Sequence, residues 1–156
     1  MIEVVVPGVG KYIFKYLVCD YNGTLAVDGS LITGVADLLI KLSKKLEIFI
    51  VTADTFGVAK DHLEGLPVKL SVLNNKNQDI LKNQFIENLS FNNVVAVGNG
   101  RNDLLMLKNA KLGIAIIEKE GINVNSFLNS DIICKSPIDA LELLLNTKRL
   151  IATLRK

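Results

Sequence analysis

The sequence predicts an α/β fold, a three-layer Rossmann-like sandwich in which a mostly parallel sheet carries helices on both faces. This prediction rests on one pattern. Short runs of apolar and β-branched residues alternate with segments of helical periodicity, and strands that are separated by helices generally pair in parallel. No internal repeat, low-complexity tract or linker interrupts the alternation, so the 156 residues are expected to form one domain, 1–156.

Two β-hairpins are expected in the first part of the chain. The runs IEVVV and KYIFKYLVC flank the turn PGVG, and the second run leads into a buried strand. Asp28 and Gly29 form a turn signal inside TLAVDGSLITG. GVADLLIKLSKKL then predicts a helix, and LEIFIV predicts a buried parallel strand. One face of that helix carries its apolar side chains: Val35, Leu38, Leu39, Leu42 and Leu46.

Helices and strands continue to alternate through the rest of the chain. TFGVAKDHLEG predicts a short helix, VKLSVL a strand and NQDILKNQFIENL an amphipathic helix. NVVAV, LGIAII and DIIC predict three more strands, and LLMLKNA predicts a helix after the first of them. SPIDALELLLNTKRLIATL predicts a final helix that is capped by Ser136 and has Pro137 in its first turn. The inward residues expected in the amphipathic helix are Ile80, Leu81, Phe85 and Leu89.

The composition disfavours several classes of partner. Eighteen basic and 16 acidic residues give a formal net charge of +2, which provides no electrostatic reason to expect nucleic acid or a membrane. No apolar run approaches the ~18 residues of a membrane span, and the N-terminal segment lacks the basic start of a secretory signal. Two cysteines, Cys19 and Cys134, form neither a disulfide framework nor a zinc motif, so a cytoplasmic location is expected.

Polar residues follow three of the predicted strands at the point where each strand ends. Asp20 ends YLVC, Thr52 ends IFIV, and the loop GNGRND follows NVVAV. Ligands of open parallel sheets bind beyond the carboxyl ends of the strands. The sequence therefore predicts a site in which these groups meet at one edge of the sheet.

The segments DYNGTL, VTADT, a later lysine and GNGRNDLLML follow the motif order of the haloacid dehalogenase-like (HAD) superfamily. The chain resembles this superfamily over about residues 16 to 135, and is most similar to soluble proteins that resemble the phosphorylation domain of P-type ATPases. The resemblance implies a Mg²⁺-dependent phosphohydrolase that acts on a small phosphorylated molecule. The short spacing between motifs leaves no room for the cap domain that many members carry.

The resemblance assigns a catalytic role to most of the polar residues at the strand ends. Asp20 would be the nucleophile that forms an aspartyl-phosphate. Gly23 and Thr24 would shape the turn beside the phosphoryl group, and Thr52 with Ala53 would bind it.

A lysine must neutralise charge on both the nucleophile and the phosphate. Lys82 is the assignment that the resemblance favours, because it lies in the apolar helix before the GNGRND strand. The residues alone leave Lys76 as an equal alternative.

The expected metal ligands are few, because Mg²⁺ prefers one or two carboxylates together with water and phosphate oxygens. Asp20, Asp103 and the backbone carbonyl of Asn22 would bind the ion. Asn99 and Asn102 would orient the metal-bound water and the lysine from outside the coordination sphere.

Two departures from the superfamily pattern predict a slow enzyme. Position 22 is Asn where most phosphatases of the superfamily have the Asp that protonates the leaving group and activates water. This general acid–base help is typically worth about 10²–10⁴-fold. Position 99 is Asn where Asp is usual, which removes one negative charge near the metal.

Two other functional classes remain as alternatives. The first is a phosphate-binding or phospho-acceptor regulatory protein with little or no turnover. The second, a receiver-type signalling domain, is weaker because the acidic pair usual near the first strand is missing.

Four further features receive an expected role. The C-terminal helix is apolar on more than one side, so it is expected either to be buried within the chain or to contact a second subunit in a homo-oligomer that covers the capless site. Asp28 is expected to form the hairpin turn and Asp54 to cap the helix after Thr52, and either could touch substrate. His62 is expected to be a surface residue away from the strand ends.

Overall fold

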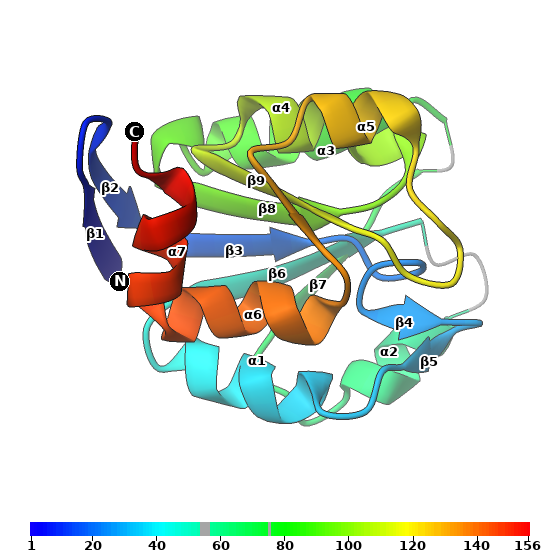
Figure 1. The fold of residues 1–156 in the computed structure, drawn as a ribbon. Coiled ribbons are helices and arrows are strands. Elements are labelled where there is room, and N and C mark those ends of the chain that lie inside the picture. Colours follow the sequence, from blue (N-terminus) through cyan, green and yellow to red (C-terminus); the bar gives the residue numbers. More distant parts are fainter. Residues whose placement is uncertain (54–56, 75) are drawn as a thin grey trace.

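The computed structural model describes residues 1–53, 57–74 and 76–156 (Figure 1). Within these residues, a central sheet of six parallel strands has the order β10-β9-β8-β3-β6-β7. Its strands are β3 (Tyr16–Cys19), β6 (Glu47–Thr52), β7 (Lys69–Val72), β8 (Val94–Gly98), β9 (Leu112–Ile116) and β10 (Ile132–Cys134).

Helices cover both faces of the sheet, so the expected three-layer α/β fold is confirmed (Figure 1). One layer contains α1 (Val35–Ser43), α2 (Val58–Leu63) and α6 (Pro137–Leu145). The opposite layer contains α3 (Gln78–Asn88), α4 (Leu104–Asn109) and α5 (Val124–Leu128). Among the described helices, none has the length and apolar character that a membrane crossing requires.

Both expected hairpins are present, at opposite ends of the sheet. Strands β1 (Ile2–Val6) and β2 (Gly10–Phe14) pair antiparallel beside α7 (Thr147–Leu154), at the end where the parallel strands begin (Figure 1). Strands β4 (Ala26–Val27) and β5 (Ser30–Leu31) form a second antiparallel pair beyond the carboxyl end of β3. We call residues 26–31 the flap. Only the flap and α1 lie between β3 and β6, so no cap domain is inserted there.

Alternation along β3 explains how the core forms on both faces of the sheet. Leu17 and Cys19 pack in the larger apolar cluster, and Val18 packs in the smaller one on the opposite face. Successive side chains of a strand point to opposite faces, so a strand that is covered on both sides must be apolar throughout. The predicted apolar face of α1 is confirmed, because the four expected residues within the helix are buried, and Leu46, which follows the helix, is buried as well.

Helix α3 is rotated relative to the expectation from its apolar pattern. Ile80 is 46% exposed, so the prediction that it faces inward is wrong. The residues of this helix that are buried are Lys82 and Ile86, which lie one turn apart. A lysine on the buried face changes which side of the helix meets the sheet, and hydrophobicity alone does not reveal this.

The C-terminal segment forms two helices instead of the single one that was predicted. The break is at Asn146, whose φ of −110° and ψ of 67° are not helical. Helix α6 begins as expected, with Ser136 Oγ accepting the N–H of Asp139 at 3.1 Å. Two helices with separate buried faces explain why this segment is apolar on more than one side. Its fully buried leucines are Leu141, Leu144 and Leu150.

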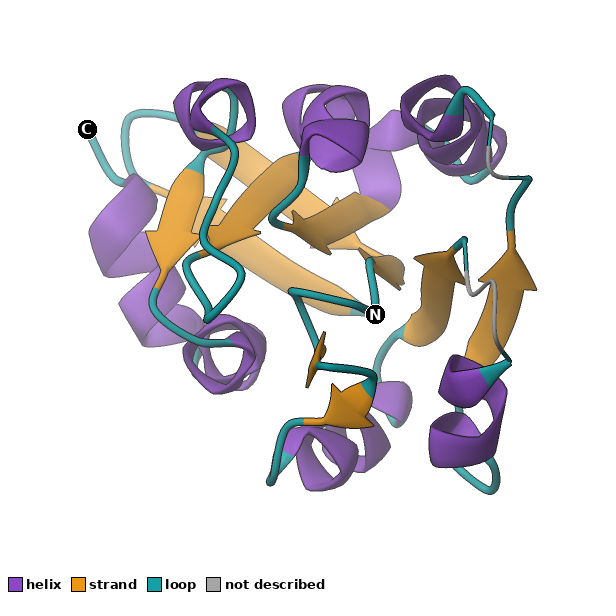
Figure 2. Ribbon diagram, turned by 90° about the vertical axis from the view of Figure 1, so that its right-hand side faces the viewer, coloured by secondary structure: helices purple, strands orange, loops and turns teal. Residues whose placement is uncertain are grey.

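The topology brings three strand ends together. The chain runs from β3 outward through β6 to β7 and then returns through α3 to β8, on the other side of β3. The order of the sheet therefore reverses next to β3, which is where ligands of such folds bind. Figure 2 shows this edge of the sheet. Thr52 is the last residue of β6, whereas Asp20 and Asn99 directly follow β3 and β8. These three strands are neighbours in the sheet.

Candidate active site

The loop after β3 is a tight turn that fixes Asp20 at the edge of the sheet. The N–H of Asp20 still pairs with the carbonyl of Val97 at 2.9 Å, so the strand register holds the residue. The carbonyl of Tyr21 then accepts the N–H groups of Leu25 and Ala26, both at 2.9 Å. These bonds close the turn and leave the Asp20 side chain pointing along the strand direction.

Gly23 is required in this turn for two reasons. Its φ is +75°, in the left-handed region that favours glycine. A β-carbon there would lie 2.6 Å from Asn99 Nδ2 and 2.6 Å from an Oε atom of Glu120. Its N–H donates to the carbonyl of Ala26 at 2.8 Å. Gly23 therefore contributes to the site by its conformation and its lack of a side chain.

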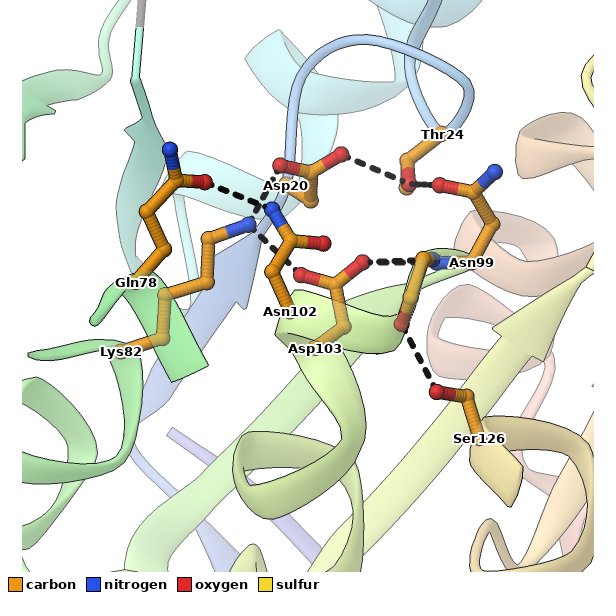
Figure 3. A network of polar contacts seen from close by, with 9 residues as sticks. Asp20, Thr24, Gln78, Lys82, Asn99, Asn102, Asp103 and Ser126 are labelled. Atoms are coloured by element: carbon orange, nitrogen blue, oxygen red, sulfur yellow. Dashed lines mark hydrogen bonds and ion pairs between the residues drawn. The ribbon is translucent and has the colours of Figure 1, made fainter. Parts of the chain in front are cut away.

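A buried lysine joins two carboxylates at the centre of the site (Figure 3). Lys82 Nζ lies 2.6 Å from Asp20 Oδ1 and 2.6 Å from Asp103 Oδ1. Lys82 and Asp103 are fully buried, and Asp20 is 7% exposed. The alternative lysine, Lys76, is exposed. Of the two candidates that the sequence left open, the structure brings Lys82 to Asp20.

Asp103 holds both the lysine and the loop that follows β8. Its Oδ2 accepts the N–H groups of Asn99 and Gly100, each at 2.9 Å. Position 98 requires glycine, because a β-carbon there would lie 2.6 Å from the carboxyl carbon of Asp103. Both oxygens of Asp103 are thus occupied by protein donors, and the side chain does not line the cleft.

Three oxygens meet at Thr24 with one hydroxyl proton among them. Thr24 Oγ1 lies 3.2 Å from Asp20 Oδ2 and 3.2 Å from Asn99 Oδ1 (Figure 3). A hydroxyl donates one hydrogen, so it can satisfy only one of these acceptors at a time. The arrangement leaves oxygen lone pairs turned toward one another, which is an environment that suits a cation.

Asp20, Lys82 and Asp103 strongly influence one another's protonation. Burial raises the pKa of the Asp20 carboxyl, and Asp103 raises it further, to about 7, although the Lys82 ammonium acts in the opposite direction. Burial disfavours the charged form of Lys82, but the two carboxylates outweigh this effect and hold its pKa above the ordinary value for lysine. The lysine therefore stays protonated, and Asp20 is the group of the pair that titrates near neutrality.

A cleft of about 520 Å³ opens above this group. Of the residues expected at the site, six line it: Asp20, Asn22, Thr52, Ala53, Asn99 and Asn102. The other expected residues, Gly23, Thr24, Lys82 and Asp103, are buried beside or beneath it. The turn of the flap, with Asp28 and Gly29, forms another part of its lining.

Three residues that line the cleft were not predicted from the sequence: Val58, Gln78 and Glu120. Gln78 Oε1 accepts a hydrogen bond from Asn102 Nδ2 at 2.8 Å (Figure 3). Its position one turn before Lys82 on the same helix is a signal that could have revealed it. Glu120 comes from a turn after β9 that carries no recognised motif, so the sequence contained no comparable signal for it.

His62 is exposed, as expected, but it contacts the flap. Its Nδ1 lies 2.8 Å from the carbonyl of Gly29 and 3.1 Å from the hydroxyl of Tyr21. The Tyr21 hydroxyl also donates to the Gly29 carbonyl at 3.0 Å. Helix α2 thereby touches the flap and the turn that follows Asp20. Asp54, the expected helix cap, lies outside the described residues.

Comparisons with known proteins indicate the family to which the chain belongs. Residues 74–120 match the family model of haloacid dehalogenase-like hydrolases. The chain is 48% identical over 82 residues to the uncharacterized protein MJ0073 of Methanocaldococcus jannaschii, a match that covers 50% of this chain and 88% of that protein. The chain belongs to the HAD superfamily.

Other members extend the comparison to phosphatases. The chain is 34% identical over 90 residues to a phosphoserine phosphatase of Lactococcus lactis, which is 57% of this chain but only 42% of that protein. A crystal structure of 3-deoxy-D-manno-octulosonate 8-phosphate phosphatase from Moraxella catarrhalis, with magnesium, phosphate and KDO, superposes with a TM-score of 0.70 at 16% identity. This match covers 91% of this chain and 94% of that one, and at such identity it shows the shared fold.

The expectations of a HAD-type hydrolase and of a Rossmann-like fold without a cap domain are confirmed. The narrower similarity to the phosphorylation domain of P-type ATPases stays a prediction. The two residues that depart from the HAD pattern lie in different environments. Asn22 is exposed at the cleft, whereas Asn99 is buried and donates from Nδ2 to the carbonyl of Gly121 at 3.1 Å.

The cysteine next to Asp20 lies in a setting that favours its protonated thiol. Cys19 is fully buried in β3, and burial raises the pKa of its thiol, with further contributions from Asp20 and Asp103. A thiol that stays protonated is a poor nucleophile.

The first testable consequence concerns the buried lysine. Lys82→Met should lower the free energy of unfolding by about 3–5 kcal/mol, because it leaves two neighbouring carboxylates without their counter-charge in the protein interior. Urea unfolding at pH 7.5, followed by circular dichroism, measures the change. Lys76→Met is the matched control and should shift stability by less than about 0.5 kcal/mol, since Lys76 is exposed. Equal effects of the two substitutions would contradict the role given to Lys82.

The second consequence is a pH dependence that belongs to Asp20. Its pKa in the folded protein, about 7, exceeds the ordinary value of 3.8, so between these pH values the folded chain retains a proton that the unfolded chain releases. The contribution of the Asp20 proton to the free energy of unfolding is therefore fully present below about pH 4 and is lost as pH rises through about 7.

In the presence of a chelator, wild type should lose stability relative to Asp20→Asn across this interval, by an amount on the order of a few kcal/mol. Urea unfolding at a series of pH values measures both proteins. A stability difference that stays constant from pH 4 to pH 8 would show that Asp20 titrates as an ordinary carboxyl.

Proposed function

We propose that this protein is a Mg²⁺-dependent phosphohydrolase that works through an aspartyl-phosphate at Asp20 and acts slowly on small phosphorylated molecules. The observation that carries the proposal is the buried Lys82 ammonium, which lies 2.6 Å from Asp20 at the floor of an open cleft. Packing alone does not require three buried charges at the end of the central strand, because buried ion pairs contribute little to stability.

The chemistry begins with the carboxylate of Asp20. One of its oxygens attacks phosphorus, a new O–P bond forms, and the P–O bond to the leaving group breaks, so that the leaving alkoxide departs with the electron pair. A water oxygen then attacks phosphorus, the bond between Asp20 and phosphorus breaks, and Asp20 is regenerated as a carboxylate. The protons of the water leave with inorganic phosphate, and the alkoxide takes its proton from solvent. Lys82 neutralises charge on the carboxylate and on the phosphoryl oxygens during both steps.

The donor set fits a small divalent cation. Among the residues that the structure describes, no three His, Cys, Asp or Glu side chains gather into a metal-binding group. Mg²⁺ suits such a site because it keeps several waters and takes one or two carboxylates. Asp20 and the backbone carbonyl of Asn22 are the proposed ligands. When bound, the ion supplies positive charge that stabilises the transferring phosphoryl group.

We modify the sequence-based assignment of the remaining metal ligand. Both oxygens of Asp103 are already bonded to Lys82, Asn99 and Gly100, whereas Asn99 Oδ1 lies next to the hydroxyl that contacts Asp20. Asn99 therefore becomes the proposed third ligand. Asp103 takes the positioning role, in which it holds Lys82 and the loop after β8.

The phosphoryl group is proposed to bind between the turn of Gly23 and Thr24 and the end of β6. Thr52 and Ala53 line the cleft opposite that turn, and Asn102 lines it next to Gln78. The flap borders the same cleft with Asp28 and Gly29. A small phosphorylated substrate fits an opening of about 520 Å³.

Slow turnover follows from Asn22. An amide can neither protonate the leaving oxygen nor take a proton from the attacking water, so both steps lose general acid–base help. The regulatory alternative, a phospho-acceptor with little or no turnover, is not favoured by the relatives, among which a phosphoserine phosphatase is found. A homo-oligomer that covers the open site stays a prediction.

Trapping with beryllium fluoride tests the central step. The full chain with Mg²⁺ and beryllium fluoride should form an aspartyl adduct at Asp20 that mimics the phosphoenzyme, visible by fluorine NMR and as a raised melting temperature. Asp20→Asn should form none, because an amide does not coordinate beryllium in this way. Asp28→Asn, which removes another carboxylate of the same cleft, should still form the adduct. An adduct on Asp20→Asn, or none on wild type, would refute the proposal.

The leaving group provides an independent test of Asn22. Wild type should hydrolyse para-nitrophenyl phosphate much faster than an alkyl phosphate, since a good leaving group needs no proton. Asn22→Asp should raise the rate on the alkyl ester by about 10²-fold and should raise the aryl rate less. Phosphate release in steady state measures both. Equal rates of wild type on the two esters would mean that leaving-group protonation does not limit this enzyme.

A further inference from the structure

The turn after β9 places a carboxylate at the cleft, close to the loop that follows β8. Glu120 lines the cleft, and one of its carboxylate oxygens lies 2.6 Å from the point where a β-carbon of Gly23 would stand. The amide of Asn99 approaches the same point, with Nδ2 at 2.6 Å and Oδ1 at 2.9 Å. Glu120 and Asn99 therefore meet over the one residue of the nucleophile turn that has no side chain.

Hydrogen bonds from Asn99 hold this turn in place. Its side-chain Nδ2 donates to the Gly121 carbonyl at 3.1 Å, and its backbone carbonyl accepts the N–H of Asn123 at 2.9 Å. Ser126 Oγ adds a bond of 2.7 Å to the Gly100 carbonyl (Figure 3). The segment 118–126 is thus fastened along the loop after β8, and Glu120 is presented from a fixed backbone.

An aspartate at position 99 would lose the hydrogen bond that Asn99 donates to the Gly121 carbonyl. A carboxylate has no hydrogen to donate, so it would face the Gly121 carbonyl with an oxygen and repel it. It would also add a second negative charge beside Glu120. The amide at position 99 and the acid at position 120 are therefore mutually compatible, whereas two acids at these positions are not.

The charge balance of the site shows what Glu120 can contribute. Asp20, Lys82 and Asp103 together carry one net negative charge when all three are ionised, and the single positive charge among them is already shared by two carboxylates. Mg²⁺ is usually bound through one or two carboxylates, and Asp20 is the one carboxylate among the three proposed ligands. Glu120 adds one negative charge on the side of the cleft where the amide of Asn99 carries none.

We propose that Glu120 supplies the negative charge for the divalent cation that Asn99 does not provide, so that the acidic group has moved from position 99 to position 120. This proposal rests on the metal-dependent function above. In this proposal Glu120 acts on the ion through metal-bound water and through its charge, as a positioning residue.

Calorimetric titration of the full chain with MgCl₂ tests the proposal without any substrate. Glu120→Gln should weaken Mg²⁺ binding by about 10-fold, the lower end of the range for residues that act from outside the coordination sphere. Its unfolding curve in the presence of a chelator should match that of wild type, because Glu120 is exposed. Glu118→Gln, in the same turn but outside the cleft lining, is the matched control and should bind Mg²⁺ as wild type does.

A charge exchange tests whether the two positions are coupled. Asn99→Asp should strengthen Mg²⁺ binding in the Glu120→Gln background and should help much less in wild type, where the two acids repel each other. Mg²⁺ affinity of Glu120→Gln within twofold of wild type would overturn the proposal. So would equal gains from Asn99→Asp in both backgrounds, or a loss seen with Asp28→Asn but not with Glu120→Gln.

Failure of this inference can be told apart from failure of the proposed function. If wild type binds no Mg²⁺, or if Asp20→Asn binds it as well as wild type does, the metal site at Asp20 itself is refuted. If binding requires Asp20 but is indifferent to Glu120, only the assignment of Glu120 fails.

Discussion

The ammonium of Lys82, buried between Asp20 and Asp103, is the interaction on which the rest of the site depends. It crosses from α3 to the carboxyl ends of β3 and β8, so it ties one helical layer to the centre of the sheet. Without it, two carboxylates would lie close together in the interior with no counter-charge. Asp103 also anchors the backbone of Asn99 and Gly100, so Lys82, Asp20 and the β8 loop form one connected unit.

Glycines allow this unit to be compact. Gly98 permits the carboxyl group of Asp103 to lie against the end of β8, and Gly23 leaves room for Asn99 and Glu120 beside the turn that follows Asp20. At both positions a side chain would occupy space that a functional group now fills. The close approach of backbone and charged groups therefore depends on glycine at both positions.

Local patterns predicted the fold, and the resemblance to the HAD superfamily predicted most of the residues that line the cleft. The strand ends at Asp20 and Thr52 and the loop at Asn99 were recognisable from alternation and turn chemistry. What the sequence could not predict depends on how elements pack. Which lysine enters the interior was undecided, Ile80 was placed on the wrong face of α3, and Glu120 had no motif to mark it.

The two chain ends lie far from the reactive centre. Met1 donates from its amino group to the Lys45 carbonyl, and the N–H of Lys156 donates to the Pro7 carbonyl, both at the side of the sheet where the parallel strands begin (Figure 1). The cleft opens on the other side. A tether, tag or fused partner attached at either end would therefore leave the mouth of the cleft unobstructed. The molecule can be immobilised through its termini while its working edge faces the solution.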